Sequence, residues 1–292
     1  MYDNIDYILK NTDISNTEFL SEIPCYFDVK GEHLFNNGKE RIITGYLDNT
    51  FKITVSKACV KIKEGSLCKW YLGNNFQTLG RNDTQQAIEK LSDTLHLPIY
   101  KAIVTRLDIA TNIFMEHPVQ VYYNHLGELN YCKRVPVING SDGTEGLYYF
   151  KNNKSGLLVF YNKIKEQKSK RQPIPELYQN RHVLRYEQRY TGQLSKIFNV
   201  EHVTAEMLYN EKFYIDIIKG WGDNYKAIKK INEIKLNLEE VKGKKELYML
   251  GVKLLVEQHG GELATIEQIN EMCKIGKISK KTAFDMRKAI KE

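Results

Sequence analysis

Two stretches of this sequence alternate apolar and charged residues over the length of a β-strand, at residues 103–113 and 183–190. Successive side chains of a strand point to opposite faces of a sheet, so each stretch predicts a strand with one apolar and one charged face. The apolar sets are Ile103, Leu107, Ile109 and Ile113, and Leu184, Tyr186 and Tyr190; the polar sets are Arg106, Asp108 and Asn112, and Arg185, Glu187 and Arg189. A solvated antiparallel face whose arginines pair with its acids would give the same pattern.

The segments around these two stretches predict further strands of an antiparallel sheet, together with flanking helices. Residues 22–62 form short alternating runs separated by turn signals, which is typical of a meander. Residues 82–97 carry apolar side chains at helical spacing, and a second helix can begin at Pro118. A hairpin or loop rich in Gly, Asn and Ser is expected over 135–156, and the run GLLVFYN predicts a strand over 156–162.

The last third of the chain gives no convincing strand signal after about residue 201, and its apolar residues recur at helical spacing. We therefore expect a domain boundary near residue 198. The sequence predicts an α+β fold, with an antiparallel-sheet domain flanked by helices over 1–198 and a smaller all-helical domain over 199–292.

Composition narrows the classes of function. The net charge of +7 favours a polyanionic partner, because lysines that neutralise phosphates release counterions. The five cysteines are widely spaced without a CxxC pair, which argues against a zinc site. No run of eighteen apolar residues and no signal-peptide pattern is present, so we expect a cytoplasmic protein that does not enter a membrane.

One tyrosine stands where an apolar strand meets a polar segment. In GLLVFYNKIKE the apolar run ends at Tyr161, and Lys165 and Glu166 follow about one helical turn later. A phenol has a reference pKa of about 10, so a nucleophilic tyrosine needs a cation or an ammonium group nearby. The carboxylates of Asp108 and Glu187 are hard oxygen ligands that suit Mg²⁺ or Mn²⁺. A core or interface tyrosine is the plain alternative.

The segments VTRLDIATNIF, LLVFYNKIKE and VLRYEQRY, in this order, resemble the gene II replication initiator family of filamentous bacteriophages. That family combines an S/T-R-x-D-x-A strand, an apolar run ending in the nicking tyrosine, and an L-R-F/Y-E-x-R strand. The similarity covers about residues 80–200. Plasmid initiators of the Rep_trans type are similar more distantly, with TR-x-D, YNK-x-x-E and R-x-E elements. Isolated histidines, with no His-hydrophobic-His pair, set the chain apart from the HUH nickases.

The resemblance implies a metal-dependent nickase that starts rolling-circle replication of a phage or plasmid in a bacterial host. Attack by tyrosine would leave a 5′-phosphotyrosine link and a free 3′-hydroxyl on origin DNA that is single-stranded or supercoiled. Because no GxxxxGK[ST] phosphate loop is present, a host helicase would be needed alongside the polymerase; a homodimer is left open. The implied catalytic residues are Tyr161, Lys165 and Arg106, and the implied ligands of Mg²⁺ or Mn²⁺ are Asp108, Glu187 and Glu166.

Basic residues beside Tyr161 and near the carboxyl end are the candidate DNA contacts. As phosphate contacts they would position a strand rather than read its bases. The stretch ISKKTAFDMRKAI resembles the second helix of a helix-turn-helix element with Ser279 as its cap, although a solvated helical face is the bland alternative. The candidates are Lys163, Lys168, Lys170, Arg171, Arg185, Arg189, Lys280 and Lys281.

Three other functions fit parts of the same pattern. A non-enzymatic DNA-binding regulator would use the basic helices and leave Asp108 and Glu187 as ion pairs on the sheet. A hydrolytic metal nuclease would use the carboxylates to activate water instead of Tyr161. A recombination or transfer enzyme would use the same tyrosine chemistry on another substrate.

Overall fold

The computed structural model describes residues 1–14, 23–35, 40–137, 145–152, 156–231, 241–258 and 262–291. It divides into two compact units, Met1–Ile231 and Asn232–Glu292. The tip of the hairpin expected over 135–156 lies outside the described residues, but the two strands that flank it are described.

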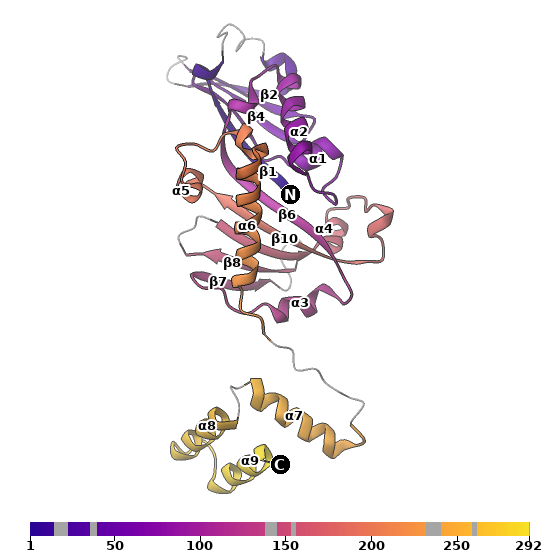
Figure 1. Cartoon of the computed structure of the whole chain (residues 1–292), viewed down its shortest axis with the longest axis vertical. Helices are drawn as coiled ribbons and strands as arrows, with labels where there is room; N and C mark the ends of the chain where they lie inside the picture. The colour runs from indigo at the N-terminus through magenta and orange to yellow at the C-terminus, as the bar shows by residue number, and fades with distance from the viewer. Residues whose placement is uncertain are drawn as a thin grey trace. The chain divides into compact units, whose positions relative to one another are not determined.

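The described part of the first unit is built on one ten-stranded sheet in which each recorded pairing is antiparallel (Figure 1). The order across the sheet is β2-β3-β4-β5-β1-β6-β10-β9-β8-β7. Together with its helices this sheet confirms the predicted α+β class. The strands are β1 Tyr2–Lys10, β2 Asp28–Phe35, β3 Glu40–Leu47, β4 Phe51–Val55, β5 Cys59–Lys63, β6 Ile103–Met115, β7 Cys132–Val137, β8 Gly146–Lys151, β9 Gly156–Asn162 and β10 His182–Thr191.

Strand β1 was not predicted, yet it lies in the middle of the sheet between β5 and β6. Ile5, Tyr7 and Leu9 alternate and are fully or almost fully buried, as a central strand requires. The register against β6 shifts between Tyr2 and Ile5. This irregularity breaks the simple alternation at the start of the strand and changes where the side chains between those two residues point.

One face of the sheet is the core face, covered by α2 (Arg81–Leu95), α3 (Val119–His125) and α6 (Glu211–Ala227) (Figure 1). Leu107 and Ile109 of β6 and the whole apolar set of β10 are buried in the core on this face, which confirms the predicted alternation for these residues. At the two ends of β6 the prediction is wrong, because Ile113 is 40% exposed and Val104 is buried in the core in place of Ile103. Helix α2 begins at Arg81, after Gly80, whose N–H donates to the Asp83 carboxylate at 3.0 Å. Shorter helices are α1 Leu67–Leu72, α4 Lys163–Ser169 and α5 Leu194–Phe198.

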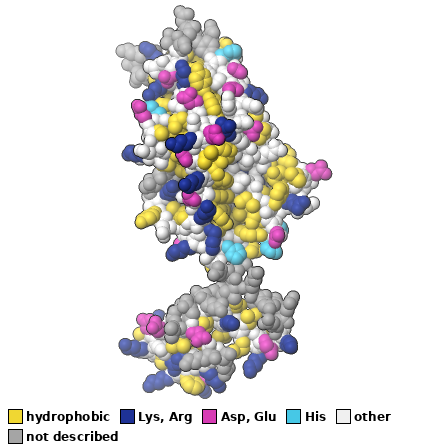
Figure 2. Space-filling model, in the orientation of Figure 1, with side chains coloured by type: hydrophobic (Ala, Val, Ile, Leu, Met, Phe, Trp, Pro, Cys, Tyr) yellow, Lys and Arg dark blue, Asp and Glu magenta, His cyan; other side chains and the backbone are white. Residues whose placement is uncertain are grey.

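Helix α6 covers the core and also leaves apolar side chains at the surface. Ile217 is buried, whereas Ile215, Ile218 and Tyr225 of the same helix are exposed. On the face shown in Figure 2, hydrophobic side chains gather along the first unit, with lysines and arginines beside them. This surface of the first unit therefore carries apolar and basic side chains next to each other.

The residues just after the expected boundary near 198 belong to the first unit. Leu208, Ile217 and Ile228 are buried in its core clusters, so α6 completes the sheet domain instead of starting a separate one. The division falls at Ile231, because the chain up to that point packs on the core face.

The second unit contains α7 (Lys244–Gln258), α8 (Glu262–Lys274) and α9 (Lys280–Lys291) in its described part. Val256, Ile269 and Ala283, one from each helix, are buried. Gly276 takes a positive φ of 75° between α8 and α9, and Ser279 Oγ accepts a hydrogen bond from the Thr282 N–H at 3.0 Å. Ser279 therefore caps α9 as the sequence predicts.

Within the part of the chain that the structure describes, none of the helices combines the length and the apolar character needed to cross a membrane.

Gly45 in β3 and Gly220 in α6 give a matched test of how closely neighbouring residues pack around each glycine. A methyl group on Gly45 would collide with the Asp28 carbonyl and lie 2.7 Å from the Phe27 ring, whereas Gly220 in α6 has open space around it. We expect Gly45→Ala to lower the free energy of unfolding by about 1–3 kcal/mol and Gly220→Ala to raise it by about 0.5–1 kcal/mol. Urea unfolding measures both, and equal effects of the two substitutions would contradict this packing.

Candidate active site

The face of the sheet opposite the core face, here called the polar face, carries the predicted site residues that belong to β6, β9 and β10. The registers of β6, β10 and β9 place them in three neighbouring rows across the strands. In strand order, the rows are Asn112, Arg185 and Tyr161; Ala110, Glu187 and Val159; and Asp108, Arg189 and Leu157. The sheet thus brings together residues that lie far apart in the sequence.

Tyr161 is the next-to-last residue of β9, and its side chain is partly buried. Its hydroxyl donates to Glu187 Oε2 at 3.4 Å. Burial raises the pKa of Tyr161 well above 10, while the charge of Arg185 acts in the opposite direction. At neutral pH the phenol is therefore protonated, and its proton points at a carboxylate.

Glu187 and Asp108 are both buried and both paired with arginines. Glu187 accepts from Arg185 Nε at 3.3 Å and from Arg189 Nε at 2.6 Å. Asp108 accepts from Arg106 Nε at 3.1 Å and Nη2 at 2.6 Å. Burial, supported by the charge of Glu187, raises the pKa of Asp108 despite its guanidinium partner. Arg106 and Arg189 are each about one-third exposed, so the site opens towards solvent at these two side chains.

Arg185 is the buried centre of the site, with 1% of its surface exposed. It donates to the Asp3 carboxylate, to Asn112 Oδ1 at 3.2 Å and to the Asn75 carbonyl at 3.1 Å. Burial alone would lower the pKa of Arg185, but its anionic neighbours raise it, so the guanidinium stays charged. Its expected role as a DNA contact does not agree with this burial.

Asp3 is a site residue that the sequence reasoning missed. Its carboxylate accepts from Arg185, from the Ser66 hydroxyl and from the Asn75 amide, and the neighbouring Asn4 amide donates to Asp108 at 3.0 Å. Burial alone would raise the pKa of Asp3, but Arg185 holds it below its ordinary value. The signal in the sequence was an acid and an amide beside the alternating apolar residues of the amino-terminal strand.

Two residues of helix α4, Lys163 and Glu166, are placed differently from what the sequence predicted. Lys163 is fully buried instead of lying on the surface, and its Nζ donates to Glu166 Oε2 at 2.9 Å. Burial and the charge of Arg185 lower the pKa of Lys163 to about 8. Glu166 also accepts from Lys170 at 2.5 Å and from Gln167 at 2.7 Å, so its oxygens are occupied and not free for a cation.

Lys165 and the exposed basic residues lie outside the buried cluster. Lys165 Nζ pairs with Glu145 at 2.9 Å instead of with Tyr161, and its side chain is 44% exposed. The other positions expected to contact DNA from the surface are exposed, as such contacts require. They are Lys168, Lys170, Arg171, Lys280 and Lys281.

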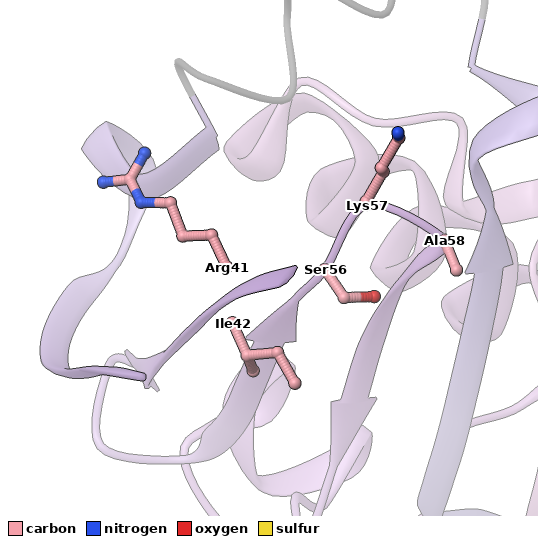
Figure 3. A pocket seen from close by; sticks show the side chains of 5 residues that line it. All are labelled: Arg41, Ile42, Ser56, Lys57 and Ala58. Carbon is pink, nitrogen blue, oxygen red and sulfur yellow. The ribbon is translucent and has the colours of Figure 1, made fainter. Parts of the chain in front are cut away.

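The pocket in Figure 3 is separate from this site. It has a volume of about 300 Å³ and lies where β3 meets the turn between β4 and β5. None of the predicted catalytic residues lines it. Its lining residues are Arg41, Ile42, Ser56, Lys57 and Ala58.

Asp108 and Glu187 fit a hard divalent cation by their chemistry and by their places in neighbouring rows of one face. Among the described residues, however, no group of three or more His, Cys, Asp or Glu side chains is arranged to hold a metal ion. Guanidinium groups balance both carboxylates instead. A cation at this place would have two carboxylate residues of this chain as its protein ligands.

Comparison with protein families agrees with the sequence resemblance. Residues 42–208, more than half of the chain, match the Phage_CRI family model, which describes the N-terminal part of a replication-associated protein. A solved structure titled "Structure of Rolling Circle Replication Initiator Protein from Geobacillus stearothermophilus" is similar, with a TM-score of 0.44 and 13% sequence identity. The similarity covers 86% of this chain and 94% of that chain. No curated protein sequence matches this one.

The buried pair of Asp3 and Arg185 predicts a large effect of one substitution. Removing one partner leaves a buried charge without compensation, so Asp3→Asn should lower the free energy of unfolding by about 3 kcal/mol. Glu32→Gln, which removes the exposed partner of Arg41, is the matched control and should change it little. Urea unfolding measures both; an Asp3→Asn effect below about 1 kcal/mol would show an ion pair of the exposed kind.

Glu166 predicts a pH dependence. Burial alone would raise its pKa, but Lys163 and the bonds from Lys170 and Gln167 lower it to about 2 from 4.5. A carboxyl whose pKa is depressed in the folded state adds stability that is complete above its unfolded pKa and is lost as the pH falls through the folded pKa. The stability difference between the wild type and Glu166→Gln should therefore be constant above about pH 5 and shrink from about pH 4.5 towards 2. Urea unfolding across this range measures it, and a difference independent of pH would contradict the ion pair.

Proposed function

The chain belongs to the Phage_CRI family of replication-associated proteins, and from this membership we propose that it starts rolling-circle replication by nicking one strand of origin DNA with Tyr161. The contact between the Tyr161 hydroxyl and the Glu187 carboxylate carries the proposal, because it pairs a phenol with a group able to take its proton. A DNA-binding regulator would need the ion pairs of the polar face but not this phenol.

The reaction is a transesterification at phosphorus. Tyr161 Oη forms a bond to the phosphorus of the scissile phosphodiester while the bond from phosphorus to the 3′-oxygen breaks. The phenolic proton passes to Glu187, and the departing 3′-oxygen takes up a proton to become a 3′-hydroxyl. The products are a 5′-phosphotyrosine and a primer end for a polymerase, so no nucleotide cofactor is needed.

The arginines of the polar face supply positive charge for this step. Arg185 lies close enough to Tyr161 to oppose the rise of its pKa, so it favours the phenolate that attacks. Arg106 and Arg189 are partly exposed beside the acids and can meet the scissile phosphate, on which negative charge develops. In this proposal Arg185 stabilises the nucleophile, and the two outer arginines stabilise the phosphate.

Asp108 and Glu187 are the residues of this chain that would hold Mg²⁺ or Mn²⁺. Such an ion, when bound, lowers the barrier by stabilising charge on the phosphate oxygens. Arg106 and Arg189 already cover these carboxylates from the exposed side, so their guanidinium groups would have to give way to the ion. Glu166 is not included in this ligand set, because Lys163, Lys170 and Gln167 bind its oxygens.

The exposed lysines and arginines provide the contacts to the DNA backbone. Lys168 lies at the end of the helix that Tyr161 leads into, Lys170 and Arg171 follow it, and α9 presents Lys280 and Lys281 in its first turn. Phosphate contacts of this kind orient a strand without reading its sequence. The host helicase and polymerase would act on the nicked strand in the bacterial cytoplasm.

Tyr161→Phe tests the nucleophile directly. The substitution removes one hydroxyl, so the full-length variant should bind supercoiled DNA of its replicon like the wild type but convert it to open circles at least about a thousandfold more slowly, as expected for loss of a nucleophile. Agarose gels in the presence of Mg²⁺ measure the conversion. Tyr100→Phe, at an exposed tyrosine of the short helical turn Ile99–Lys101, is the control. Normal nicking by Tyr161→Phe would contradict the role of Tyr161 and leave the hydrolytic nuclease as the explanation, whereas no nicking by the wild type itself would favour the regulator.

A further inference from the structure

Part of the polar face is open and aromatic. Tyr148 and Phe150 are two residues apart on β8, and their rings are nearly parallel, with centroids 6.1 Å apart and an angle of 13° between the planes. Phe150 is 45% exposed. The residue between them, Tyr149, points to the core face and is fully buried, so the alternation of β8 assigns both neighbouring rings to the polar face.

The aromatic pair continues the rows that contain the nucleophile. Gly146 pairs with Tyr161, Tyr148 with Val159, and Phe150 with Leu157. A side chain on Gly146 would lie 3.2 Å from the Tyr148 ring and 3.3 Å from Tyr161 Cβ. The Tyr148 ring and Tyr161 Cβ therefore border the same space beside Gly146.

Positive charge stands on both sides of the exposed ring. The registers place Lys133, Phe150, Leu157 and Arg189 side by side in one row across β7, β8, β9 and β10. Lys133 is exposed, and Arg189 is about one-third exposed. The row spans three strand spacings, about 14 Å, with an apolar middle and a cation at each end.

We propose that Tyr148 and Phe150, with Lys133 and Arg189 on either side, form a stacking platform for unpaired bases of single-stranded DNA beside the phosphate that Tyr161 attacks. The inference rests on the proposed function, since it names where the strand to be nicked lies. Bases stack on aromatic rings regardless of sequence, and lysine and arginine neutralise the phosphates that connect those bases. An unpaired strand satisfies both parts of this surface, whereas a base inside a duplex cannot reach the rings.

Binding of a fluorescent single-stranded oligonucleotide of mixed sequence to the full-length chain tests the platform, with chelator present so that no strand is cut. Phe150→Ala should weaken binding by about five- to a hundredfold, the range for loss of one stacked base. Phe150→Trp keeps a stacking ring and should bind like the wild type. Tyr100→Ala is the matched control, because it removes a similarly exposed aromatic ring in a different part of the fold.

An abasic oligonucleotide with the same number of phosphates separates stacking from charge. It should bind the wild type and Phe150→Ala with equal affinity, because it has no bases to stack. Equal affinity of the wild type and Phe150→Ala for the normal strand would overturn the platform while leaving the proposed nicking intact. A loss by Phe150→Ala that is just as large with the abasic strand would also overturn it. If the wild type bound no single-stranded DNA, the platform would fail, while the nicking of supercoiled DNA by the wild type would still test the proposed function separately.

Discussion

A buried guanidinium organises the polar face of the sheet. Arg185 joins Asp3 of β1, Glu187 of its own strand and Asn112 of β6, and it also binds the backbone at Asn75. A charge at this depth is tolerated only when it is compensated and hydrogen-bonded. Asp3 and Glu187 are held in position by their ion pairs with this guanidinium. The contacts that stabilise the buried charge therefore also position the carboxylate that Tyr161 contacts.

The polar face has two regions, one closed and one open to solvent. Around Arg185 the face is closed, and the pKa of Tyr161 is raised by burial. Towards Arg106, Arg189 and Phe150 the face is open. In the proposed function, the scissile phosphate would approach from the open region towards the place where Tyr161 contacts Glu187.

Because a period of two residues fixes which side chains share a face, the alternation of β6 and β10 predicted the two faces of the sheet over most of their length. The α+β class also depended on the helical spacing of other segments of the sequence. Asp3 escaped prediction because a register shift in β1 directs both Asp3 and Asn4 towards polar-face residues, which simple alternation cannot show. Lys163 and Lys165 could not be assigned because the exact turn from strand to helix, capped by Asn162, decides which lysine turns inward. The boundary at Ile231 depends on the docking of α6, which helical periodicity alone does not reveal.

Mass spectrometry of the protein–DNA product measures the identity of the nucleophile most directly. The full-length chain is incubated with supercoiled DNA of its replicon and Mg²⁺, the DNA is digested to nucleotides, and the peptides are mapped. We expect one modified peptide, with the phosphoryl group of a 5′-nucleotide on the Tyr161 oxygen. A nicked product with a free 5′-phosphate and no modified peptide, or a nucleotide attached to a different residue, would contradict the role of Tyr161 as nucleophile.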